Sequence, residues 1–145
     1  MNLPKIKIRV EFEAGEKLFK INSSKDAEKA FREVFDADTI NWTEEFILLC
    51  LNNENEVMGY SKISSGGMTS TVVDARVLFT IALNSTATSI IIAHNHPSGV
   101  LIPSQADINI TNQLVEGGKL LNIKLIDHLI ISRNGYYSFL DEGQI

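Results

Sequence analysis

The sequence lacks the features of a secreted or membrane-spanning protein. Cys50 is the one cysteine among 145 residues, so no internal disulfide can form, which agrees with a reducing compartment. No apolar run approaches the roughly 20 residues that are needed to cross a bilayer. The first residues alternate charged and apolar side chains and contain no continuous apolar stretch of the kind found in a signal peptide. These absences predict a cytoplasmic protein without a membrane segment.

The sequence also lacks an excess of positive charge. Lys and Arg together number 13 against 18 Asp and Glu, which gives a net charge of −5. Because broad binding to a nucleic-acid backbone needs a basic surface, direct DNA binding is not expected. The hydrophobic share of 44% and the charged share of 21% are ordinary for a globular chain. We expect one domain over residues 1–145, with Cys50 in its core.

The pattern of apolar residues predicts alternating helices and strands with hairpins at both ends. Period-two alternation and a turn at 14–15 predict an N-terminal β-hairpin over 5–21, which precedes a core domain over 22–145. The apolar face of this hairpin would comprise Ile6, Ile8, Val10 and Phe12. Further expected elements are helices over 23–35, 74–84 and 104–119, a hairpin over 45–64, a buried strand over 88–94 and a hairpin over 123–140. Gly117 and Gly118 are expected to end the third helix. A mixed sheet flanked by helices follows, in an α/β or α+β arrangement.

The stretch from Ile90 to Asp107, "IIIAHNHPSGVLIPSQAD", contains the main chemical signal. His94 and His96 are two residues apart at the end of a strand, so both imidazoles point to the same face. Asp107 lies at the start of the next helix, and the intervening loop is long enough to fold it back. Two histidines, one carboxylate and an open position make up a catalytic zinc site. For a single histidine, satisfied burial would be the usual interpretation, but two on one face favour a metal.

Ser104 and Asp107 also have a purely structural interpretation. The pattern S-x-x-D is typical of a helix start, with the serine as N-cap. The two roles are compatible, because a capping serine at a rigid helix start can also face a site.

Two acidic residues stand at the start of the apolar run "EFILLCL". The carboxylate of Glu45, at the mouth of a buried strand, could act as general base on a metal-bound water. The alternative is a solvent-exposed charge at a strand start, and Glu44 beside it competes for the same role. One of the two must point inward, and the residues alone favour neither. His128 is a further candidate ligand, for which we favour a structural role, with Asp127 and His128 on opposite faces of their strand.

The residues of these motifs resemble those of a known family. H-x-H-P followed by S-x-x-D resembles the JAMM (MPN-plus) metalloprotease signature, and the particular residues within it resemble those of the RadC family. RadC-like segments occur in the same order from about Ile21 to the C-terminus: "EEFILLCLN", "SSGGMTSTVVDARVLFTIAL", "AHNHPSG", "PSQAD", "LIDHLIIS" and "GYYSF".

The resemblance implies a cytidine-deaminase-like three-layer α/β/α fold with one Zn²⁺ per chain. By position, His94, His96 and Asp107 would be the zinc ligands. Glu45 would act on the zinc-bound water, and Ser104 would help to stabilise the oxyanion of a tetrahedral intermediate. The implied activity is hydrolysis of a peptide or isopeptide bond in a peptide or protein substrate. Substrate contacts are expected in the loops at 64–68 and 98–102.

Other functions are weighed against this one. RadC proteins usually carry an N-terminal helix-hairpin-helix region, for which this chain has neither the room nor the turns, so the DNA-repair association implied by the family name is weakened. A non-catalytic interaction module and a metal-dependent nuclease are the alternatives. The adjacent letters "HNH" do not make an HNH nuclease, whose residues are spread over a ββα unit. A nucleoside deaminase would need H-x-E and a downstream P-C-x-x-C.

The N-terminal hairpin would expose an edge that can pair with a neighbour, and the sequence assigns no oligomeric state.

Overall fold

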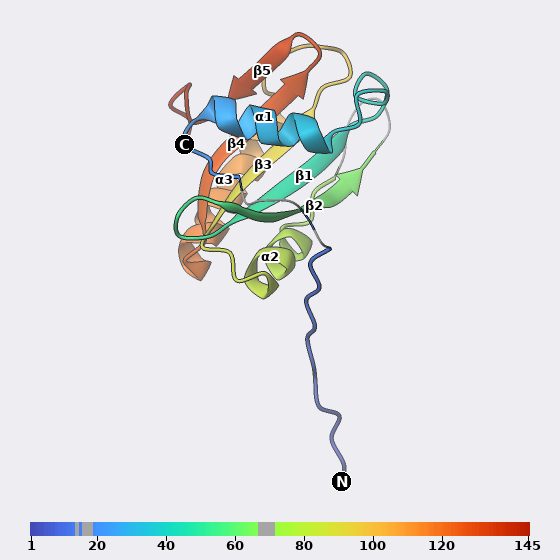
Figure 1. Cartoon of the computed structure of the whole chain (residues 1–145), viewed down its shortest axis with the longest axis vertical. Coiled ribbons are helices and arrows are strands. Elements are labelled where there is room, and N and C mark those ends of the chain that lie inside the picture. The colour runs from blue at the N-terminus through green and yellow to red at the C-terminus, as the bar shows by residue number, and fades with distance from the viewer. Residues whose placement is uncertain (14, 16–18, 67–71) are drawn as a thin grey trace.

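A mixed five-stranded sheet forms the centre of the computed structural model, which describes residues 1–13, 15, 19–66 and 72–145 (Figure 1). The elements within these residues are α1 (Ser24–Val34), β1 (Glu45–Leu51), β2 (Val57–Ser65), α2 (Ala75–Asn84), β3 (Ser89–Asn95), α3 (Gln105–Leu121), β4 (Lys124–Ser132) and β5 (Gly135–Ser138). The α/β class is therefore confirmed. None of the helices in these ranges is both long and apolar enough to cross a membrane.

The order of the strands places β1 and β3 in the interior of the sheet. The order is β2-β1-β3-β4-β5, in which β3 and β4 are parallel and the other neighbours are antiparallel. Every residue of β1 and of β3 is buried, as expected for their continuous apolar runs. A parallel pair needs a crossover connection, and α3 supplies it between β3 and β4. The start of α3 is thereby returned to the end of β3.

Helices cover both faces of the sheet and complete three layers (Figure 1). On one face α1 buries Ala27 and Phe31 against the strands. On the other face α2 and α3 contribute Leu78 and Leu114 to a second apolar cluster, which also contains Cys50. Each cluster uses alternate residues of β1 and β3, so the sheet has a core on both sides. The three-layer arrangement and the burial of Cys50 agree with the sequence-based prediction.

The helices begin where the sequence predicts. Ser23 caps α1 by accepting a hydrogen bond from the Asp26 backbone N–H at 3.2 Å. Asp74 caps α2 by accepting one from the Arg76 backbone N–H at 2.9 Å. Both caps satisfy backbone donors that have no partner inside the helix.

The third helix ends two residues beyond its predicted end at 119, and the prediction that Gly117 and Gly118 stop it is wrong. The helix continues through Gly117 and Gly118 to Leu121 and ends at Asn122, whose φ of 55° is left-handed. A Cβ on Gly118 would collide with the Ile123 carbonyl oxygen, and one on Gly117 would lie 2.8 Å from the Phe79 ring. These glycines therefore allow close approach of α3 to its neighbours, whereas the sequence pattern suggested a helix stop.

The predicted N-terminal hairpin is formed only at its downstream end. Residues 1–13 contain no strand and run away from the domain (Figure 1). Its predicted turn lies partly outside the described residues, because residue 14 is not among them. Lys20 forms an antiparallel bridge with Glu56, flanked by a 2.8 Å hydrogen bond from the Val57 N–H to the Phe19 carbonyl. The upstream half finds no neighbouring strand within the described part of the chain, so its alternation alone does not create one.

A small substitution tests the packing role of Gly118. We expect Gly118→Ala to lower the free energy of unfolding by about 1–3 kcal/mol, because overpacking against a backbone carbonyl outweighs the gain in helix propensity. Gly15→Ala is the matched control, since a Cβ there would meet nothing within 4 Å. Urea unfolding followed by circular dichroism measures both variants. Equal stability of Gly118→Ala and the parent chain would contradict the packing explanation.

Candidate metal centre

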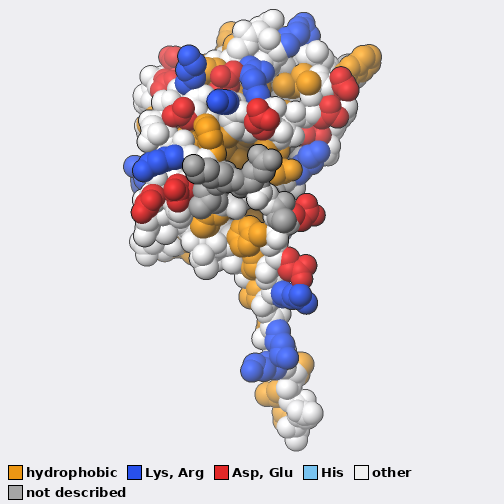
Figure 2. All heavy atoms as spheres, in the orientation of Figure 1, with side chains coloured by type: hydrophobic (Ala, Val, Ile, Leu, Met, Phe, Trp, Pro, Cys, Tyr) orange, Lys and Arg blue, Asp and Glu red, His pale blue; other side chains and the backbone are white. Residues whose placement is uncertain are grey.

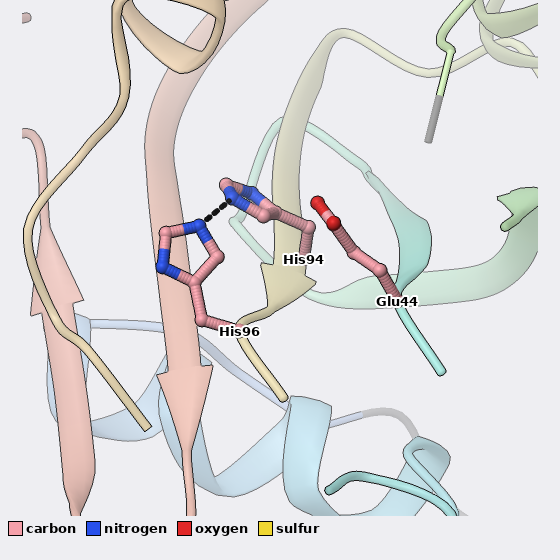
Figure 3. Close-up of side chains that lie close together, drawn as sticks. All are labelled: Glu44, His94 and His96. Carbon is pink, nitrogen blue, oxygen red and sulfur yellow. Dashed lines mark hydrogen bonds between the residues drawn. The ribbon is translucent and has the colours of Figure 1, made fainter. Parts of the chain in front are cut away.

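The candidate site lies at the carboxyl end of β3, where three segments of the chain meet. His94 is in β3, His96 is the first residue after β3, and Asp107 is in the first turn of α3. Antiparallel pairing of β1 with β3 sets Phe46 opposite His94. Continuing that register by two residues brings Glu44, just before β1, to His96. Figure 3 shows the Glu44 carboxylate beside the two imidazoles.

The three predicted metal ligands converge within hydrogen-bonding distance. The Nε2 atoms of His94 and His96 are 2.9 Å apart. His94 Nε2 lies 3.1 Å from Asp107 Oδ1, and His96 Nε2 lies 3.4 Å from Asp107 Oδ2. A carboxylate oxygen of Glu44 and one nitrogen of each histidine also fall within 4.8 Å of one another. Ligands of a tetrahedral zinc ion at about 2.0–2.1 Å from the metal stand about 3.3 Å apart, so the arrangement fits a cation of this size.

The tautomer of His96 is fixed by the loop that follows it. Its Nδ1 lies 2.8 Å from the Val100 carbonyl oxygen, which can only accept, so Nδ1 carries the hydrogen. The lone pair of Nε2 is then directed at His94 and Asp107. This is the state that a metal-binding histidine requires.

A chain of hydrogen bonds fixes the tautomer of His94 in the same sense. The Thr111 hydroxyl donates its one proton to the Asp107 carbonyl oxygen at 2.6 Å. Its oxygen must therefore accept from His128 Nδ1, which lies 2.6 Å away. His128 Nε2 is then an acceptor, and it lies 2.8 Å from His94 Nδ1. The hydrogen of His94 stays on Nδ1, and its Nε2 lone pair faces the site.

These tautomers leave three electron-rich groups facing one another. Two Nε2 lone pairs and the Asp107 carboxylate meet at about 3 Å with only acceptor atoms between them. A cation, either a proton or a metal ion, is what this donor set requires. The hydrogen bonds that orient the imidazoles come from outside the cluster, so both lone pairs are directed into it without any contribution from a bound cation.

Burial and the neighbouring groups shift the acid–base properties of the site. Burial raises the pKa of Asp107, but contacts with His94 and His96, which stabilise the carboxylate when an imidazole is protonated, outweigh it and hold the pKa well below its usual range. The bond to Asp107 raises the pKa of His96, whereas burial lowers that of His94. Burial raises the pKa of Glu44 to about 7, partly opposed by His96. Glu44 is thus a carboxyl group that can gain or lose a proton near neutral pH.

Glu44, not Glu45, occupies the position beside the histidines. Glu45 Oε1 accepts a hydrogen bond from Lys62 Nζ of β2 at 2.8 Å, and successive residues of an extended chain point to opposite sides. The sequence-based prediction placed Glu45 at the site. Both faces of β1 are buried, so the burial pattern could not distinguish the two acids. The deciding information is the pairing of β1 with β3.

Ser104 and Asp107 form the predicted capping box. Asp107 N donates to Ser104 Oγ at 3.1 Å, and Ser104 N donates to Asp107 Oδ2 at 2.8 Å. The cap therefore holds the carboxylate that faces the histidines, and both interpretations of the S-x-x-D pattern apply. The hydroxyl proton of Ser104 is not used by the cap, so the predicted role toward an oxyanion stays a prediction.

His128 is buried behind His94 and is engaged through both ring nitrogens. It stacks on Phe139 with ring centroids 4.6 Å apart, and its two nitrogens contact His94 and Thr111. These contacts give it a positioning role in place of a fourth ligand. Asp127 points to the other face, where it accepts a 2.6 Å hydrogen bond from the Ser138 hydroxyl, as predicted.

Asn95 is a further positioning residue, which sequence reasoning missed. Its amide accepts a hydrogen bond from the Glu45 N–H and donates to the carbonyls of Ile40 and Thr43, each at 2.7 Å. The segment that carries Glu44 is thereby tied to β3. An asparagine between two candidate ligands at the end of an apolar run is the one sequence signal that could have indicated this role, and the structure buries it fully.

Fold and site together define an α/β protein with a group of histidine and carboxylate side chains that could hold a metal ion at the end of a buried strand. The family model of the RadC-like JAB domain matches residues 21–144, and the chain belongs to this family. A UPF0758 protein of Flavobacterium johnsoniae is 46% identical over 127 residues, which cover 88% of this chain and 54% of that protein. A UPF0758 protein of Methanosarcina barkeri is 44% identical over 100 residues, covering 69% and 44% of the two chains. The chain thus spans about half the length of the curated relatives that it matches.

The hydrogen-bond chain behind His94 can be tested with two substitutions at one position. We expect Thr111→Val to weaken Zn²⁺ binding about 10–100-fold, because the acceptor for His128 Nδ1 is lost and the imidazoles are no longer held in one tautomer. Thr111→Ser keeps the hydroxyl and is the matched control. Competition titration against a chromophoric chelator measures both affinities. Equal affinities in the two variants would show that the chain does not tune the site.

Proposed function

We propose that the protein is a zinc-dependent hydrolase of peptide or isopeptide bonds, in which Glu44 is the general base. The observation that supports this most strongly is the Glu44 carboxyl, with its pKa raised to about 7, beside the converging Nε2 atoms of His94 and His96. Membership of the RadC-like JAB family supports the same class of chemistry. A peptide or protein is the proposed substrate.

The proposed mechanism assigns a task to each group. His94, His96 and Asp107 hold the zinc ion, which when bound supplies a Lewis acid that polarises a carbonyl and acidifies water. Glu44 accepts a proton from the attacking water as the C–O bond forms. It returns that proton to the leaving nitrogen as the C–N bond breaks. A carboxyl group that can both accept and release a proton is suited to both transfers.

The surroundings of the site suggest how a substrate carbonyl is bound. Ser104 stands at the N-terminus of α3, where its hydroxyl can donate to the developing oxyanion and the positive end of the helix dipole favours negative charge. The 98–102 loop holds His96 through Val100 and exposes 72% of Ile102, so it offers an apolar contact for the substrate. The other expected contact loop, 64–68, lies partly outside the described residues.

Metal analysis tests the ligand set. Protein purified without chelator should contain about one zinc ion per chain, since the site provides two histidines and one carboxylate. His94→Ala should lose this stoichiometric zinc, because its Nε2 is the most buried ligand atom. Thermal unfolding of the variant provides the control for folding. Full zinc retention by a folded His94→Ala protein would refute the assignment.

A matched pair of glutamine variants tests the general base. Glu44→Gln should retain zinc and lose about 10²–10⁴-fold in turnover, the usual contribution of proton transfer by a positioned group. Glu45→Gln should retain both zinc and most of the turnover, because its side chain is directed to Lys62. Cleavage of a proteome-derived peptide library, read by mass spectrometry, provides the assay. Loss of turnover in Glu45→Gln with full activity in Glu44→Gln would reverse the assignment.

A further inference from the structure

The segment over residues 5–13, here called the N-terminal arm, leaves most of an apolar face exposed. The side chains of Ile6, Ile8 and Phe12 are 88%, 70% and 57% exposed. They alternate with charged residues, which is the pattern of a strand with one buried face. Figure 2 shows the arm projecting from the domain with apolar and charged side chains along it. An exposed row of large apolar side chains of this kind marks an interaction surface.

The arm starts from an edge of the sheet and is anchored there. A Cβ on Gly59 of the edge strand β2 would lie 3.3 Å from the Phe12 ring, so the ring packs where this residue has no side chain. A few residues further along the chain, Phe19 and Ile21 already bond to the segment that leads into β2. The arm is therefore held at its base and extended beyond it, and its residues belong to no strand within the described ranges, so its backbone can pair with another strand.

The charges of the arm identify a partner that fits it. Its charged face is basic in the first half, with Lys5, Lys7 and Arg9, and acidic in the second, with Glu11 and Glu13. A second copy in antiparallel orientation, with Val10 opposite Val10, pairs Lys7 with Glu13 and Arg9 with Glu11 on both sides of the centre. Opposite charges across an antiparallel pair are stabilising, and like charges directly opposite are destabilising.

Other ways of pairing two arms are less favourable. Parallel pairing in register would set each lysine, arginine and glutamate against its own copy. A shift of the antiparallel register by one residue would set apolar side chains against charged ones. A shift by two residues, with Arg9 opposite Arg9, brings two like charges together. The register centred on Val10 avoids all of these conflicts.

We propose that the N-terminal arms of two copies pair as an antiparallel β-ribbon and so form a two-fold symmetric dimer. Ile8 of each copy then lies opposite Phe12 of the other, next to the central pair of Val10 residues. Because each copy presents the same segment, the contact is self-complementary and closes at two chains. The proposal is independent of the metal centre and of the proposed hydrolase activity.

A charge exchange between two variants tests whether basic and acidic side chains pair between the two arms. One variant carries Lys7→Glu and Arg9→Glu, and the other carries Glu11→Lys and Glu13→Lys. Each alone faces like charges across the ribbon and should dimerise at least about tenfold more weakly than the parent chain. An equimolar mixture should form a heterodimer, because every charged pair is again complementary. Sedimentation equilibrium over a wide range of protein concentrations gives the association constants.

The outcomes distinguish this ribbon from other forms of association. A monomeric parent chain would overturn the proposal, and so would a mixture of the two variants that does not regain the association. Either charge variant dimerising as well as the parent would also overturn it. Val10→Asp, which sets two carboxylates opposite each other at the centre, should abolish the dimer. All three variants lie outside the folded sheet, so unchanged thermal unfolding confirms that the domain is intact.

Discussion

The single proton of the Thr111 hydroxyl sets the direction of every hydrogen bond behind the metal centre. Because it is donated to the Asp107 carbonyl, the oxygen of Thr111 must accept from His128, and His128 must accept from His94. The result is a lone pair on His94 Nε2 that points at the Asp107 carboxylate. Asp107 thus supplies a candidate ligand atom with its side chain, and its backbone carbonyl is the end of the hydrogen-bond chain.

The topology of the sheet brings together the two ends of this chain of hydrogen bonds. The parallel pairing of β3 with β4 requires a crossover, and α3 returns its first turn to the end of β3. Asp107 and Thr111 are one helical turn apart, so they face the same side of the helix. The Ser104 cap then fixes where that side begins. The S-x-x-D motif that begins α3 therefore also positions the candidate ligand Asp107.

Those features of the fold and of the candidate site that depend on nearby residues in the sequence could be predicted from local patterns. The spacing of His94 and His96, the S-x-x-D cap and the alternation of elements predicted the layer arrangement and the three candidate ligands that the structure brings together. The choice between Glu44 and Glu45 depends on the β1–β3 register, which two fully buried faces do not reveal. The role of His128 depends on contacts with residues from other elements, and sequence spacing carries no trace of them. Gly117 and Gly118 were misread because close packing and helix termination both use glycine.

The position of Asn95 between the two histidines couples the register of β3 to the geometry of the candidate metal site. Imidazoles at 94 and 96 face the candidate metal site, while the amide at 95 faces the other way and holds the segment before β1. A slip of β3 by one residue would turn the amide toward the metal and both imidazoles away, and would release that segment as well. A chain misfolded in this way could neither bind the ion nor place Glu44. A metal ion bound as proposed would therefore stabilise the correctly aligned sheet over a sheet with β3 out of register by one residue.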